Sequence, residues 1–154
     1  MKIAIIFFFC VLSFQFADAQ ITMAKKADWK PIGKLKSLGS TIASLEYRES
    51  GRETIYFLFM RDFTRRGENA ETQFFSITFN GVDDTFEMFY ELLKSFFLDE
   101  NRNNKNYNQT FRLGDHMVHL QHCWLITGKG VMLSTNEGYI NLSKGDIEKL
   151  FNKK

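Results

Sequence analysis

Only two cysteines occur in the sequence, Cys10 and Cys123. Cys10 lies in an apolar N-terminal stretch, residues 3–14, that has the pattern of a removable leader. Once such a leader is removed, Cys123 is the single remaining thiol, so a disulfide within the chain is excluded. Small exported domains often depend on disulfides for their stability. We therefore expect this fold to depend on its hydrophobic core instead.

The sequence also has little excess charge of either sign. Its 20 Lys and Arg residues nearly balance its 18 Asp and Glu residues, which gives a formal net charge of +2. Proteins that bind nucleic acid or anionic lipid usually concentrate basic residues. The composition therefore predicts no nucleic acid partner and gives no signature of an anionic lipid surface. It does not identify the ligand or protein partner.

A run long enough to span a bilayer is missing, because the apolar stretch at residues 3–14 covers about 12 residues and a spanning helix takes roughly 20. Lys2 precedes this stretch, and the small residues Ala17 and Ala19 follow it. This is the order of regions in a secretory signal peptide. With its Phe-rich core and Gln20 at the new N-terminus, the leader resembles those of exported bacterial proteins. The sequence predicts cleavage after Ala19 and a secreted or periplasmic protein.

Familiar catalytic motifs are missing as well. The sequence contains no Gly-rich phosphate loop, no G-x-S-x-G turn, no H-E-x-x-H pattern and no internal repeat. It therefore predicts no cofactor and no catalytic residues. Catalytic groups can also assemble in space from distant positions, so this absence does not by itself exclude an enzyme.

Phenylalanine is abundant, with 17 residues in 154, and its spacing predicts the secondary structure. We expect a single α+β domain at residues 40–154, after an irregular lead-in at 20–39. The domain is predicted to be a mostly antiparallel sheet of about six to seven strands, with one long amphipathic helix and a short C-terminal helix. The polar stretch 99–108 is expected to be an exposed loop. The expected strands are 41–49, 53–63, 72–80, 107–113, 116–127, 131–135 and 138–142.

The two helices are expected at 84–98 and from Ser143 onward. A period of 3.6 residues in the apolar positions indicates an amphipathic helix for the first. Asp84 and Glu87 have the spacing of a capping box at its start, and Ser143 is a good N-cap for the second helix, with Asp146 three residues later. The aromatic stripe of the first helix consists of Phe86, Phe89, Tyr90, Leu93, Phe96 and Phe97.

All three histidines precede Cys123 in one short segment, as His116, His119 and His122. In a strand, with a rise of about 3.3 Å per residue, His116 and His122 would stand roughly 20 Å apart, and His119 would point to the opposite face. In a helix, His119 and Cys123 could instead reach one Zn²⁺. Alternating apolar residues favour the strand. We therefore predict histidines in structural or solvent-facing roles and no metal site.

Two roles are open to Cys123. Adjacent strand residues point to opposite faces, so His122 cannot act as its base. A thiol buried among Trp124, Leu125 and Ile126 is unreactive, and this is the role that we expect. The alternative is a nucleophile that works with a spatially distant histidine.

Outside this segment, the doublet Arg65-Arg66 lies in an expected loop and is a candidate for an anion or partner contact. The candidate site residues are thus His119, His122, Cys123, Arg65 and Arg66. The sequence favours a non-catalytic binding or accessory module of the periplasm or cell exterior. A small hydrolase or thiol enzyme that uses Cys123 is the alternative.

Export gives a first testable prediction. Mass spectrometry of protein recovered outside the cytoplasm should find a chain that begins at Gln20, because Ala17 and Ala19 place small residues at the two positions that the signal peptidase recognises. An intact Met1 terminus in fractionated cells would contradict the leader assignment.

Overall fold

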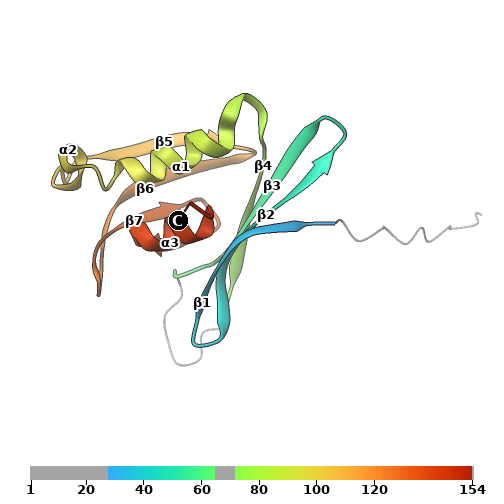
Figure 1. Ribbon diagram of the computed structural model, residues 1–154. Coiled ribbons are helices and arrows are strands. Elements are labelled where there is room, and N and C mark those ends of the chain that lie inside the picture. Colours follow the sequence, from blue (N-terminus) through green and yellow to red (C-terminus); the bar gives the residue numbers. More distant parts are fainter. Residues whose placement is uncertain (1–27, 65–71, 154) are drawn as a thin grey trace, which may run out of the picture.

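In the computed structural model, which describes residues 28–64 and 72–153, eight strands form two four-stranded antiparallel sheets (Figure 1). In each sheet, strands that follow one another in sequence are neighbours. The first sheet consists of β1 (Lys30–Ser37), β2 (Ser40–Ser50), β3 (Glu53–Arg61) and β4 (Phe74–Asn80). The second consists of β5 (Asn108–Leu113), β6 (His116–Leu125), β7 (Gly128–Ser134) and β8 (Tyr139–Leu142).

A helix follows each sheet. A short 3-10 turn, η2 (Val82–Asp84), leads from β4 into α1 (Thr85–Ser95), and α2 (Asp99–Arg102) comes next. The second sheet is followed by α3 (Lys144–Leu150), which packs on β1 and β2 of the first sheet. No helix in the described part of the chain is both long and apolar enough to cross a membrane.

The α+β class and antiparallel pairing are confirmed, but the expectation of one sheet with six to seven strands is wrong. The added strand is β1, in a region where the sequence analysis expected an irregular lead-in. The sequence contains little sign of this strand, because Leu35 is its one fully buried residue and Pro31 and Gly33 interrupt its pattern. Gly33 allows the strand to approach α3, because a Cβ there would lie 2.2 Å from the Leu150 carbonyl oxygen.

The two sheets meet at Asp62, which directly follows β3. The Phe63 amide donates to the Tyr139 carbonyl oxygen at 2.9 Å, and the Tyr139 amide donates to Asp62 Oδ1 at 3.1 Å. Asp62 Oδ1 also accepts from the Thr64 amide and hydroxyl, at 2.9 and 2.5 Å. Asp62 is only 8 % exposed, and these bonds supply the donors that a buried polar group requires.

A second meeting point lies between β4 and the turn from β5 to β6. Gly114 has a φ of +59°, and a Cβ there would lie 2.0 Å from the Thr78 carbonyl oxygen. A residue with a side chain would therefore clash with β4 as well as adopt a left-handed backbone.

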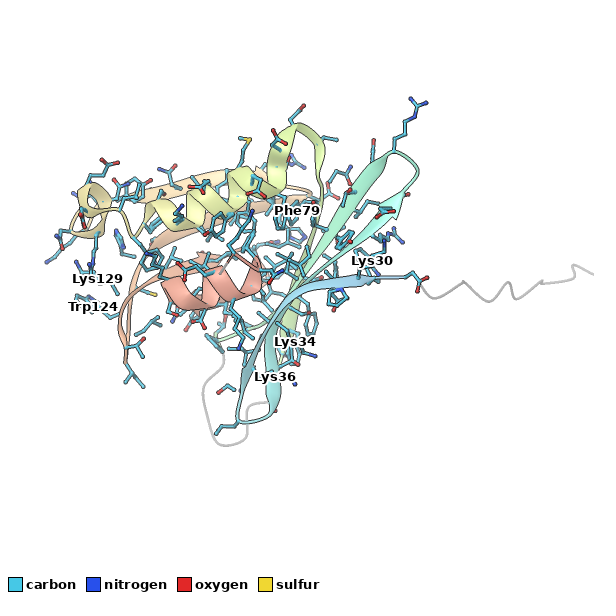
Figure 2. All side chains as sticks on the ribbon, in the orientation of Figure 1. Lys30, Lys34, Lys36, Phe79, Trp124 and Lys129 are labelled. Carbon is cyan, nitrogen blue, oxygen red and sulfur yellow. The ribbon has the colours of Figure 1, made fainter. Side chains whose placement is uncertain are left out.

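The core fills the space between the inner faces of the sheets and the two longer helices. Phe89 of α1 is 2 % exposed, and its ring centroid lies 5.9 Å from Phe79, 6.0 Å from Phe111 and 5.5 Å from Phe151. Figure 2 shows Phe79, a residue of β4, next to α1. The apolar face predicted from the sequence is therefore buried at Phe89, Tyr90 and Leu93. The helix is shorter than the predicted 84–98, because α1 ends at Ser95 and the buried Phe96 is its C-cap.

The outer face of the first sheet is also aromatic. Phe59 stacks on Phe74 with ring centroids 4.7 Å apart, and Trp29 lies against Phe57 at 5.4 Å. The guanidinium carbon of Arg48 lies 5.0 Å from the centroid of the Trp29 ring. The sequence analysis interpreted apolar residues on both faces of β3 as the sign of a central strand. On the outer face, Phe57 and Phe59 pack against Trp29 and Phe74.

The predicted capping box at α1 and the predicted N-cap at α3 have opposite outcomes. At α3, Ser143 Oγ accepts from the Asp146 amide at 3.1 Å and Asp146 Oδ2 accepts from the Ser143 amide at 2.9 Å, as predicted. At α1, Asp84 makes no such bond, because the η2 turn holds it at a left-handed φ of 57°. The predicted exposed loop at 99–108 also differs, since it begins with α2.

We predict that Phe89→Ala lowers the free energy of unfolding by about 3 to 5 kcal/mol, the usual result of emptying a buried aromatic position. Urea denaturation measures this change. The neighbouring Met88 is 65 % exposed, so Met88→Ala serves as the matched control and should change stability by less than about 0.5 kcal/mol. A loss below about 1 kcal/mol for Phe89→Ala would mean that α1 is not held by its aromatic face.

Candidate functional site

The strand assignment for the histidine segment is confirmed, and each histidine has a different neighbour. His116 Nδ1 lies 3.8 Å from Glu137 Oε1, and His119 Nδ1 lies 2.8 Å from the Thr110 hydroxyl. The structure thus separates these side chains. Among residues 28–64 and 72–153, no group of three or more His, Cys, Asp or Glu side chains is placed to hold a metal ion.

His122 joins β6 to α2. Its Nε2 donates to the Asn101 carbonyl oxygen at 3.0 Å. The imidazole ring packs edge-on against Phe96 at 5.1 Å between centroids and lies 6.3 Å from the Tyr107 ring. These contacts fix the side chain, so His122 holds α2 in place beside the strand.

Cys123 is partly buried opposite Gly130 of β7. Burial raises the pKa of its thiol from 9.0 to about 11, because a low-dielectric environment disfavours the charged thiolate. At neutral pH the group is therefore a thiol, which is a poor nucleophile. Its neighbour His122 is bonded to Asn101, so these two residues do not form a nucleophile and base pair.

Of the three neighbours predicted to bury Cys123, Leu125 is half-buried and the other two are on the surface. Trp124 is 78 % exposed and Ile126 is 108 % exposed. The expectation failed because complete burial along β6 is confined to positions closer to its start, where Val118 and Leu120 lie. Arg65 and Arg66, the remaining candidates, lie outside the described residues.

A hollow of about 450 Å³ lies where this hairpin meets α2. Three cationic residues line it and no Asp or Glu does. Trp124 and Lys129 are directly opposite each other on β6 and β7, and Figure 2 shows both at the end of the molecule that carries α2. The lining residues are Arg102, Asn103, Lys105, His122, Cys123, Trp124 and Lys129.

Lys129 is anchored to the last residue of α2 and to the residue that follows it. Its Nζ donates to the Arg102 carbonyl oxygen at 2.8 Å and to Asn103 Oδ1 at 2.5 Å. The same atom lies 5.8 Å from the centroid of the Trp124 ring, within the range of a cation–π interaction. A lysine ammonium has three N–H donors, so one remains for a ligand.

A second hollow, of about 480 Å³, shares Arg102 and Lys129 with the first and adds Lys144. Its lining also contains no Asp or Glu. We call Arg102, Lys105, Lys129 and Lys144 together the basic surface. Four cations with an exposed indole ring beside them can attract an anion electrostatically and offer an apolar contact next to it.

Of the residues that line the first hollow, the sequence analysis gave only His122 and Cys123 as candidate site residues. Arg102 and Lys105 lie in a stretch interpreted as a solvated loop, and Lys129 lies in an expected Gly-Lys-Gly turn. The expected turn was misplaced by the sequence analysis, because β7 already begins at Gly128 and Lys129 lies in that strand opposite Trp124.

The raised pKa of Cys123 generates a prediction for the processed chain, which lacks Cys10. At pH 7.5, iodoacetamide should modify folded Cys123 about tenfold more slowly than the same thiol in the unfolded chain. A shift of about two pKa units lowers the thiolate fraction about a hundredfold, and the greater intrinsic nucleophilicity of a more basic thiolate offsets roughly tenfold of this. The rate should continue to rise up to about pH 11, and a plateau below pH 8 would show an activated thiol.

We compared the chain with known proteins at the level of families, individual sequences and folds. No family model, no curated protein and no solved structure matches it significantly.

Proposed function

We propose that this protein is an exported, non-catalytic binding module that holds an anionic partner at the basic surface. One observation carries the proposal: four cations line two adjoining hollows without a carboxylate in either lining. The chain has 18 Asp and Glu residues and a net charge of only +2, so this local excess of positive charge differs from the composition as a whole.

The ion pairs of the protein support this argument. Several lysines elsewhere are paired with a carboxylate, as in Lys30–Glu49 at 3.0 Å and Lys153–Glu87 at 2.6 Å, although Lys34 and Lys36 of β1 form no such pair with the residues that the structure describes. Within the described residues, by contrast, Arg102, Lys105 and Lys129 form no ion pair. Lys144 lies 4.0 Å from Glu148, at the limit of a pair on an exposed helix. Unneutralised cations in a concave surface give a positive potential that draws anions.

The state of Cys123 favours binding over the thiol enzyme that was the alternative. Its raised pKa keeps the nucleophile protonated at neutral pH. Export, which the signal peptide pattern at residues 1–19 supports, would place the basic surface in the periplasm or outside the cell.

The proposal predicts that position, rather than net charge, decides binding to a soluble polyanion. The double variant Lys105→Glu with Lys144→Glu should bind heparin about tenfold or more weakly than the parent in low salt, because it reverses two of the four charges of the basic surface. Salt elution from a heparin column and titration calorimetry measure this difference.

The matched control is Lys34→Glu with Lys36→Glu, which changes net charge equally on exposed positions of β1, along the strand where Figure 2 labels them. It should bind heparin within about twofold of the parent. Equal losses in the two double variants, with unchanged thermal midpoints, would mean that heparin senses only overall charge and that the basic surface is not a site.

A further inference from the structure

The tip of the β6–β7 hairpin carries two exposed apolar side chains next to the basic surface, Trp124 near the end of β6 and Ile126 in the turn itself. Trp124 is 78 % exposed and Ile126 is 108 % exposed. We propose that this hairpin tip docks on an anionic phospholipid surface, with Trp124 and Ile126 entering the interface while the basic surface contacts lipid phosphates. The inference rests on the proposed function, because it names the partner of the same site.

Shape favours a bilayer over a small enclosed ligand. A small molecule is usually held in a concave site that covers most of its surface. Ile126 lines neither of the two hollows and projects fully from the turn. A protruding aliphatic side chain gains most from a partner into which it can insert, and the boundary of a lipid layer provides that environment.

The identity of the residues points in the same direction. Tryptophan is enriched at the boundary between lipid and water, because its ring is apolar and its N–H can donate to a polar group. Single exposed apolar residues are common in soluble proteins. Leu38 of the β1–β2 turn is such a case, at 104 % exposed. The tip of the β6–β7 hairpin differs because it combines two such side chains with the adjoining basic surface.

Charge complementarity selects an anionic lipid. Each Lys or Arg near a negatively charged membrane strengthens binding by about fivefold at moderate salt, and Arg102, Lys105, Lys129 and Lys144 all lie at this end of the molecule. Lys129 adds order, since its bonds to Arg102 and Asn103 hold it beside Trp124. The docking is peripheral and requires no spanning helix.

The test uses the processed chain that begins at Gln20, so that the apolar leader does not itself bind lipid. Sedimentation should show binding to vesicles of equal parts phosphatidylglycerol and phosphatidylcholine, and little binding to pure phosphatidylcholine. Ile126→Asp should weaken binding at least about tenfold. Leu38→Asp, which is the same change of charge at an equally exposed turn, should stay within about twofold of the parent. In a Trp29→Phe background, the fluorescence of Trp124 should shift to shorter wavelength on anionic vesicles.

Three results would overturn the inference. One is vesicle binding that Ile126→Asp leaves unchanged while Lys105→Glu with Lys144→Glu abolishes it, because attraction would then occur without insertion. Another is an unchanged Trp124 spectrum on vesicles that bind the protein. The third is release of the protein by millimolar glycerol phosphate, which would show a site for the free head group.

Heparin binding separates this inference from the proposed function. Loss of heparin affinity in the double variant, with no vesicle binding by the parent, would leave the binding module standing and reject the lipid partner. Equal heparin affinity in both double variants and no vesicle binding would reject both.

Discussion

The hydrogen bonds at Asp62 hold the two sheets together, and the placement of everything else follows from that junction. A buried carboxylate is stable only with donors around it, and Thr64 and Tyr139 supply them from two separate parts of the chain. Because the end of β3 is fixed to β8, the inner faces of the sheets enclose a common space that α1 and α3 fill. The close approach of Gly114 to the Thr78 carbonyl oxygen is a second contact between the two sheets.

This arrangement leaves one end of the second sheet without cover. Near the start of β6, Val118 and Leu120 are completely buried, whereas Trp124 near its end is mostly exposed. Figure 1 shows α2 at the end of the molecule remote from the first sheet. His122 and Lys129 attach α2 there through backbone carbonyl groups. The basic surface therefore lies at the α2 end of the second sheet, next to the packed core.

Local patterns were enough to predict much of this fold. The spacing of Phe89 and its neighbours gave the helix, alternation gave β4 and β6, and Ser143 gave the start of α3. The separation into two sheets was not predictable in this way, because it depends on contacts between Asp62 and Tyr139, distant in sequence. The same applies to Trp124, since an apolar strand residue is buried only where another element covers it. The basic surface combines residues of α2, β7 and α3, so no short motif could reveal it.

The first sheet ends in β1, whose outer edge has no strand beside it in the described part of the chain. Such an edge presents free backbone groups to any second copy of the same strand, which is a common start of aggregation. Lys34 and Lys36 are exposed on this strand. When two copies approach edge to edge, four ammonium groups would be brought close together, and their repulsion opposes pairing. These two lysines lie outside the core, so their charges can oppose edge pairing without affecting how the domain packs.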